Sequence, residues 1–475
     1  MIIASLLPLL LAAAAATTAS VSEAPCLRPT RAGTQVQGDV RVCPGKYRIA
    51  DPGEKGVIIA AASGTRIDLS GVTLESGDSV PARYAGIGIV SRGVDGVTVL
   101  GGIVRGYRFG IRIEGGRGHR VTGIDLSGSR SQPLRSTAER TDSVDRLDPY
   151  HLKVLDTYGG GLLLQGTGGA TITGVIARGA QNGIGLVDSR DGYVADNDFS
   201  GNSGWGLNLW RSSHNAVVRN QAGRTRRCEK DGGCDAAAIL VREGSDSNTF
   251  SDNDLTDSSI GVLVTGASPL SRASVGNLFN RNDASQAIES GFMVRLTWAT
   301  TFFENRADSS GTGFKLVRAS GQSIRGNTVI GSRDAGVGAA SGSDNAIQQN
   351  VLLGGRVGIE VLATDGSAPP GRSYRIDDNV IGSVTRGIVL QGVARSRIRG
   401  NVIDGVDEAV VIDSTGHATE VTGNVFLRAS GSYIVAPDLA AGGNYWATPD
   451  ARAAAGRVQG RISVLPWKPA SAAGY

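Results

Sequence analysis

Short segments of the sequence follow the pattern small residue, apolar residue, any residue, apolar residue. Basic side chains recur at or near the ends of these segments. Arg242, Arg295 and Lys315 occupy alternate positions of three such segments, so an extended backbone would present them on one face. A row of cations can hold the carboxylates of an extended anionic chain, and an indole offers an apolar surface to a sugar ring. We therefore predict a basic groove that binds an acidic polysaccharide. The predicted binding residues are Trp210, Asn208, Arg211, Arg318, Glu243, Asp188 and Tyr150.

Two reactions on a uronate chain begin with the loss of a proton beside the carboxylate. In β-elimination the leaving oxygen then departs, and in epimerisation the proton returns from the other face. Lys315 is a candidate base because Arg295 and Arg318 beside it favour the neutral amine. His151, in a charged segment, is a second candidate. Lyase or epimerase chemistry is favoured over hydrolysis, and the predicted catalytic residues are Lys315, His151, Arg242 and Arg295.

Other interpretations of the same residues stay open. Asp188 and Glu243 lie two repeats apart, about 9.6 Å at the spacing of neighbouring strands. That separation is near the upper limit for the carboxylate pair of an inverting glycoside hydrolase. A protein that binds carbohydrate without modifying it would also use a basic groove. The charges could equally belong to an ordinary solvated surface, on which Arg242 and Glu243 simply pair.

The segments that carry these residues repeat along the chain. A recurring asparagine marks them, with an underlying period of about 22 residues and a few insertions. The period, the alternating apolar pattern and 69 glycines predict an all-β solenoid, a parallel β-helix of roughly 14 rungs. We expect the asparagines to adopt left-handed turn geometry and to form a hydrogen-bonded ladder. They are Asn197, Asn220, Asn253, Asn277, Asn305, Asn327, Asn350, Asn379, Asn401, Asn424 and Asn444.

The repeats resemble those of the right-handed parallel β-helix proteins of the pectate-lyase-like superfamily, which are carbohydrate-active. The units that begin at Asn182 and Trp205 and end at Asn197 and Asn220 carry the resemblance most clearly. It covers about residues 40–446. The resemblance implies the fold and leaves the reaction open, because this architecture hosts lyases, hydrolases, epimerases, adhesins and accessory proteins.

Finer similarities point in different directions. The sequence Asp148-Pro149-Tyr150-His151 is similar to the Asp-Pro-His-Asp motif of β-helical mannuronan epimerases, but its third and fourth residues differ. The ending at Asn444 resembles that of periplasmic β-helix accessory proteins of copper insertion. Four histidines and two methionines in 475 residues disfavour copper handling. The signatures of polygalacturonases and the aspartate cluster of calcium-dependent pectate lyases are not found. No cofactor is predicted, and calcium stays open as an alternative without an evident site.

The remaining features predict an exported protein. Cys26 with Cys43 and Cys228 with Cys234 form two local pairs, which favours disulfides. A net charge of +4 gives no reason to expect a nucleic acid partner, and no membrane span is expected. We therefore predict a secreted or periplasmic location, and the oligomeric state stays open. The predicted organisation is a signal peptide at 1–24, an N-terminal cap at 25–56, the β-helix at 57–446 with insertions at 131–157 and 224–234, and a C-terminal tail at 447–475.

Overall fold

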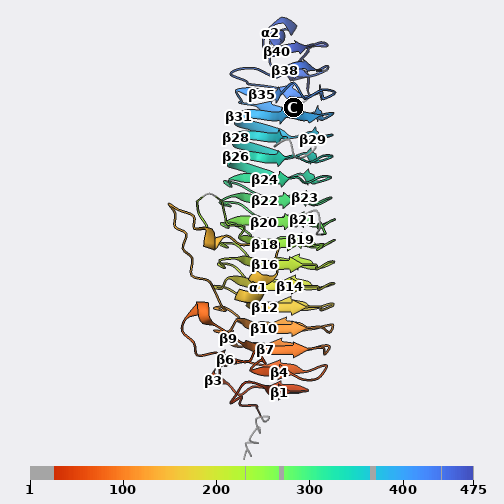
Figure 1. Cartoon of the computed structure of the whole chain (residues 1–475). Coiled ribbons are helices and arrows are strands. Elements are labelled where there is room, and N and C mark those ends of the chain that lie inside the picture. Colours follow the sequence, from red (N-terminus) through yellow and green to blue (C-terminus); the bar gives the residue numbers. More distant parts are fainter. Residues whose placement is uncertain (1–25, 231, 267–271, 364–370, 440, 474–475) are drawn as a thin grey trace, which may run out of the picture.

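The computed structural model describes residues 26–230, 232–266, 272–363, 371–439 and 441–473. The predicted signal segment lies outside these ranges. Within them the chain winds as a tall column of stacked strands, from β1 (Thr34–Val36) at the bottom of Figure 1 to β40 (Val458–Ile462) and α2 (Ala451–Ala455) at the top. Neighbouring strands pair in parallel along the column. The predicted right-handed parallel β-helix is confirmed.

Two long sheets run the length of the column. The 21-stranded sheet contains β1 (Thr34–Val36), β4 (Ile58–Ala60), β7 (Ile87–Arg92), β10 (Phe109–Glu114), β12 (Gly160–Gln165), β14 (Asn182–Val187), β16 (Trp205–Trp210), β18 (Ala237–Arg242), β20 (Ile260–Thr265), β22 (Ser290–Arg295), β24 (Thr312–Val317), β26 (Thr328–Ala340), β28 (Val351–Leu362), β31 (Val380–Gln391), β34 (Val402–Asp404), β35 (Glu408–Ile412), β37 (Val425–Phe426), β38 (Ile434–Leu439), β39 (Tyr445–Trp446), β40 (Val458–Ile462) and β41 (Lys468–Pro469).

The other long sheet has 15 short strands and forms the opposite wall of the coil. They are β2 (Asp39–Arg41), β5 (Arg66–Asp68), β8 (Thr98–Leu100), β11 (Arg120–Thr122), β13 (Thr171–Thr173), β15 (Tyr193–Ala195), β17 (Ala216–Val218), β19 (Thr249–Ser251), β21 (Leu278–Asn280), β23 (Thr301–Phe303), β25 (Ser323–Arg325), β27 (Ala346–Gln348), β30 (Arg375–Asp377), β33 (Arg397–Arg399) and β36 (Glu420–Thr422). Small sheets join β3 (Gly45–Arg48), β6 (Val72–Glu75) and β9 (Ile103–Arg105), and β29 (Gly371–Arg372) with β32 (Val393–Ala394).

Apolar side chains of both sheets alternate into a continuous core. Ile184 and Leu186 point into it as predicted, whereas Val187 faces the outside of the coil. In the middle of the column the core is aromatic, and the Phe250 and Phe279 rings stack with their centres 4.4 Å apart. Such contacts add about 0.5–1.5 kcal/mol per pair to the burial of the rings.

The asparagine ladder is confirmed, with two corrections. Asn305 shows the pattern, because its Nδ2 donates to the Asn327 Oδ1 at 3.1 Å and to a core backbone carbonyl at 2.9 Å. Asn282, rather than the predicted Asn277, stands between Asn253 and Asn305, and Asn277 belongs to a parallel ladder. The left-handed backbone falls on the residue before the asparagine, as at Glu304 with φ 55°, because the asparagine itself must aim its amide along the stack.

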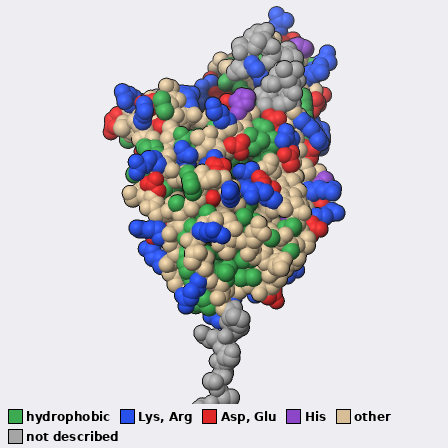
Figure 2. All heavy atoms as spheres, turned by 60° about the horizontal axis from the view of Figure 1, so that its bottom comes forward, with side chains coloured by type: hydrophobic (Ala, Val, Ile, Leu, Met, Phe, Trp, Pro, Cys, Tyr) green, Lys and Arg blue, Asp and Glu red, His purple; other side chains and the backbone are tan. Residues whose placement is uncertain are grey.

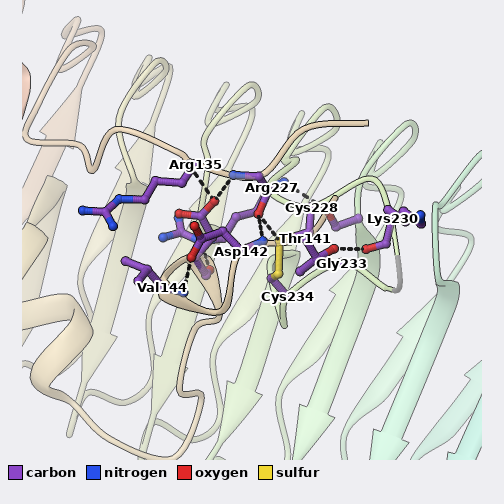
Figure 3. The surroundings of a disulfide bond; sticks show 12 residues. Arg135, Thr141, Asp142, Val144, Arg227, Cys228, Lys230, Gly233 and Cys234 are labelled. Atoms are coloured by element: carbon purple, nitrogen blue, oxygen red, sulfur yellow. Dashed lines mark hydrogen bonds between the residues drawn. A yellow bond between two sulfur atoms is a disulfide. The ribbon is translucent and has the colours of Figure 1, made fainter. Parts of the chain in front are cut away.

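The two predicted insertions leave the column and meet each other. We call residues 131–158 the flap and residues 224–234 the disulfide loop. The flap carries the helices η2 (Ser143–Asp145) and α1 (Lys153–Tyr158) and runs along the 21-stranded sheet (Figure 1). Arg227 of the disulfide loop donates to the Asp145 carbonyl, and the Leu147 N–H donates to the Cys234 carbonyl at 3.0 Å. Figure 3 shows this junction around the disulfide between Cys228 and Cys234.

Both ends of the described part of the chain join the coil. The disulfide between Cys26 and Cys43 forms as predicted, within the predicted cap. Residues 447–475, set apart as a tail in the sequence, contain α2 (Ala451–Ala455) and two strands that pair with β38 and β39. Helices η1 (Pro81–Arg83) and η3 (Ala470–Ala473) complete the structure. Among the described residues, no helix has the length and apolar character needed to cross a membrane.

Candidate functional site

The outward face of the 21-stranded sheet, where the basic groove was expected, is covered over much of its length. Leu155 of the flap packs on Leu163, Val187 and Trp210, and Leu147 belongs to a second apolar cluster over the following strands. The outward positions of β18, β20 and β22 hold Leu240, Leu263 and Met293, which are buried. The predicted basic residues are therefore not placed in one open groove: one lies under the flap and others lie beyond its edge.

Arg242 lies under the flap and is fully buried. Its guanidinium is 4.7 Å from the ring centre of Trp205 and 4.2 Å from that of Trp210. Its Nε donates to the Asn208 Oδ1 at 3.2 Å, and its Nη1 donates to the carbonyl of Pro149 in the flap. Burial lowers the pKa of Arg242 to about 9, against the partial opposition of nearby negative charges. The predicted residues Arg242, Asn208 and Trp210 are thus brought together, but away from solvent.

A cleft opens where the flap ends. It has a volume of about 200 Å³ and is lined by Arg146, Gly232, Cys234, Asp235, Glu289 and Arg295. Arg295 forms an ion pair with Asp235, and burial, which lowers the pKa of Arg295, is outweighed by this carboxylate so that the pKa is raised. Lys315, from β24, borders the cleft and donates to Glu289 at 3.1 Å. The three cations and two carboxylates give the cleft a net charge of +1.

Arg146, Asp235 and Glu289 were not found by sequence reasoning. Asp235 directly follows the disulfide loop, and Glu289 comes immediately before β22, so neither stands on the alternating positions of a strand. The signal for Asp235 and Glu289 in the sequence was their position at the edges of an insertion and of a repeat, whereas Arg146 lies inside the insertion at 131–157.

The other predicted residues lie on the flap or on turns. The His151 side chain is 75% exposed and its Nε2 lies 3.6 Å from Asp148, so only its backbone carbonyl contacts Arg242. Tyr150 is half-buried. Asp188 and Arg211 form a two-pronged ion pair at 2.6 and 2.9 Å, and the hydrogen bond to Asp188 raises the pKa of Arg211. Four of the predicted residues occupy equivalent left-handed turn positions after their strands: Asp188, Arg211, Glu243 and Arg318.

Charges elsewhere on the surface are mixed. On the face shown in Figure 2, basic and acidic side chains are interspersed, in keeping with the small net charge of +4. The cleft and the buried arginine are therefore local features and do not belong to a broad charged field.

A protein-family model described as periplasmic copper-binding protein (NosD) matches residues 64–302, 235–368 and 271–451. Together these matches span most of the chain. The chain belongs to the NosD family. Its two disulfides and its membership of a periplasmic family agree with the predicted secreted or periplasmic location. No curated protein matches the chain.

Solved structures that resemble this NosD-family chain are distant. PfbA, a surface adhesin of Streptococcus pneumoniae, has a TM-score of 0.43 and 15% identity over 84% of this chain and 85% of its own. The A-module of the Azotobacter vinelandii mannuronan C-5 epimerase AlgE4 has a TM-score of 0.43 and 14% identity over 79% of this chain and 88% of its own. The family 28 exopolygalacturonase of Yersinia enterocolitica has a TM-score of 0.40 and 12% identity over 83% and 73% of the two chains.

The copper in the family description has no matching ligand set in the described part of the chain. No group of three or more His, Cys, Asp or Glu residues gathers there as metal ligands, and the four cysteines are consumed by disulfides. His119 is buried, and its Nε2 lies 3.0 Å from the Gly115 carbonyl. Copper favours imidazole and soft sulfur ligands, so these residues do not fit a copper centre and no chemical step is assigned to one.

Proposed function

We propose that this NosD-family protein binds an acidic, uronate-containing polysaccharide in the cleft beyond the flap. The observation that carries the proposal is the clustering of Arg146, Arg295 and Lys315 around one hollow with net charge +1. Cations that lie this close favour an anion, and a guanidinium binds a carboxylate with paired hydrogen bonds. The volume of about 200 Å³ is below the range of about 300–1,000 Å³ for pockets that enclose a whole small ligand. It suits a single residue of a longer chain.

The carboxylates of the cleft give it a second kind of contact. Asp235 and Glu289 neutralise Arg295 and Lys315. When a uronate carboxylate approaches these cations, each acidic side chain can instead accept a hydrogen bond from a sugar hydroxyl. This exchange keeps every charged group paired, which a partly buried site requires.

Elimination or epimerisation at this cleft would need a residue that neutralises the uronate carboxylate and a residue that acts as the base. Arg295 neutralises the uronate carboxylate, which makes the neighbouring proton removable. Lys315, once it is neutral and Glu289 has turned to a sugar hydroxyl, would take that proton. In elimination the resulting ammonium would pass the proton to the departing glycosidic oxygen, and in epimerisation a water molecule on the opposite face would supply the returning proton. His151 has no part in this scheme, because its imidazole is directed to solvent and to Asp148.

The test is titration of the mature protein with uronate oligosaccharides and with neutral ones of equal length, followed by calorimetry. We expect binding of the uronates only, and a loss of affinity of about tenfold or more when Arg295→Ala and Lys315→Ala are combined. Arg281→Ala is the matched control, because Arg281 also pairs with an aspartate, Asp252, but stands on a turn after β21 of the other long sheet.

The same incubations report on chemistry. Unsaturated chain ends, seen by ultraviolet absorbance, identify a lyase, and a changed ratio of epimers by NMR identifies an epimerase. Binding without either product identifies the non-catalytic accessory protein. Equal affinity for neutral and acidic chains, or no binding of either, contradicts the proposal.

A further inference from the structure

Three hydrogen-bond donors lie buried beneath the flap without an acceptor among the described residues. They are the Arg242 Nη2, the Asn208 Nδ2 and the Trp210 Nε1. The residues touch one another, because Arg242 donates to the Asn208 Oδ1 and its guanidinium lies against the Trp210 ring. Buried donors are normally paired, since water no longer satisfies them. Three in one cluster therefore point to an acceptor that comes from outside the chain.

Burial alone does not leave an arginine in this state. Arg227, in the disulfide loop, is also buried, yet its Nε, Nη1 and Nη2 donate to the Asp145 carbonyl, the Ser203 carbonyl and the Gln132 side chain. Every nitrogen of its guanidinium that bears a proton has an acceptor. Three partly buried arginines, Arg108, Arg112 and Arg130, each leave their Nε without an acceptor. Arg242 differs from them because it is fully buried and its unpaired Nη2 belongs to a cluster with two other unpaired donors.

All the hydrogen-bond acceptors of Arg242 are uncharged, and two of them belong to the flap. Its Nη1 donates to the carbonyls of Pro149 and His151, two oxygens presented by one segment. In the part of the chain that the structure describes, no carboxylate forms an ion pair with Arg242, whereas Arg211, Arg295 and Lys315 each have one. Both oxygens accept from Nη1, so the flap gives Arg242 two neutral acceptors in place of a charged one.

We propose that Arg242, Asn208 and Trp210 form a second uronate subsite, and that the flap closes it by offering its own carbonyls in place of the ligand. This inference rests on the proposed function and extends it from one sugar residue to a groove. The register supports the extension, because Arg242 pairs with Thr265 and Thr265 with Arg295 on successive strands. The two arginines thus stand two strand spacings apart, about 9–10 Å. Carboxylates of one extended chain can reach both when the flap lifts.

The flap can be loosened without touching the subsite. Leu155, on α1, packs where β14 has Gly185 in place of a side chain, and a Cβ on Gly185 would lie 3.2 Å from the Leu155 Cδ2 and 3.1 Å from the Leu163 Cδ1. Leu155→Ala removes an apolar anchor of the flap, and Gly185→Val places a wedge beneath it. Gly185 has no left-handed φ, so the backbone accepts valine.

The experiment measures the affinity of a uronate oligosaccharide for the wild type and for these two variants. A site that is open only a fraction of the time binds with its affinity reduced by that fraction. We therefore expect the affinity of both variants to be higher than that of the wild type by a factor of about five or more. Arg242→Met should abolish this gain when combined with either. Hydrogen exchange of residues 147–158 should become faster when the oligosaccharide is added to the wild type, because the bound state holds the flap open.

Val389→Ala is the matched control for the loss of an apolar contact. Val389 is buried at an outward position of β31, in a cluster without flap residues, so its truncation should leave the affinity unchanged. This inference is overturned if Leu155→Ala, Gly185→Val and Arg242→Met all bind with wild-type affinity. The proposed function still stands in that case, provided that replacing Arg295 and Lys315 abolishes binding. The absence of binding in the wild type and in both loosened variants overturns the proposed function itself. Slower exchange of the flap on binding also contradicts the inference.

Discussion

Replacing Arg242 by methionine distinguishes a residue retained for a ligand from one retained for the fold. Methionine keeps the unbranched apolar stem and removes the guanidinium group with its charge. Because Arg242 is fully buried, its pKa of about 9 can be converted into a free energy without correction for solvent. At about 1.4 kcal/mol per pKa unit, the difference from the ordinary value of an arginine means that a protonated guanidinium costs about 4–5 kcal/mol at this position.

The substitution also removes favourable contacts. Two cation–π contacts, with Trp205 and Trp210, contribute about 1 kcal/mol or more each when they are shielded from water. The hydrogen bonds to Asn208 and to the flap carbonyls contribute about 1 kcal/mol each. These gains and the cost of burial nearly cancel, so Arg242→Met should change the free energy of unfolding by less than about 2 kcal/mol at pH 7.

The cost of burying the charged Arg242 makes the free energy of unfolding depend on pH. The pKa of Arg242 is lower in the folded than in the unfolded protein, so above about pH 9 the unfolded state binds more protons and the folded state gains stability. Below that pH both states are protonated and the cost is constant. Relative to Arg242→Met, the wild type should therefore gain about 1 kcal/mol between pH 8 and pH 10. Urea unfolding followed by tryptophan fluorescence measures the difference. A loss above about 4 kcal/mol in Arg242→Met that does not vary with pH would refute the reasoning.

Two other perturbations test the scaffold. Asn305→Ala removes four ladder hydrogen bonds and leaves the buried backbone N–H of Asn282 without its acceptor, so it should lower the free energy of unfolding by about 3 kcal/mol in urea titrations. The half-buried Asn280, replaced in the same way, should cost less than about 1 kcal/mol, and equal losses would argue against the ladder as the cause. Replacing Cys228 and Cys234 by serine should speed hydrogen exchange in residues 135–158 while the exchange of the column stays unchanged. Unchanged exchange in the flap would show that the disulfide does not hold it.

The register of the solenoid was predictable because two periods fix it. Side chains alternate every two residues along a strand, and the asparagines repeat once per turn of the coil. Val187, Trp210, Arg242, Thr265 and Arg295 were therefore aligned correctly, and the strand pairing brings them into register. The error at Asn277 arose because a second ladder runs in parallel with the first, five residues away in the chain.

The position of the flap over the outward face of the 21-stranded sheet was not predictable from these two periods. The flap has no repeat, and its contacts join residues that are far apart in the chain, as when Leu155 meets Gly185 or Asp145 meets Arg227. The ion pairs of the cleft depend on Glu289, which lies between repeats. An alternating pattern specifies which side chains face outward, but it does not specify what lies on top of them.

The outward positions nevertheless contain a sign that they are covered. Leu163, Leu240, Leu263 and Met293 would expose an apolar stripe on a bare solenoid, and burying each such side chain contributes about 1.5–3 kcal/mol. Under such a cover an apolar residue would serve the fold at least as well as a charged one. Arg242 stands beside this stripe, two residues beyond Leu240 on β18, and is a cation whose burial is costly and whose donors are not all used. Its chemistry is therefore better explained by a carboxylate that enters when the flap lifts than by packing beneath a flap that never opens.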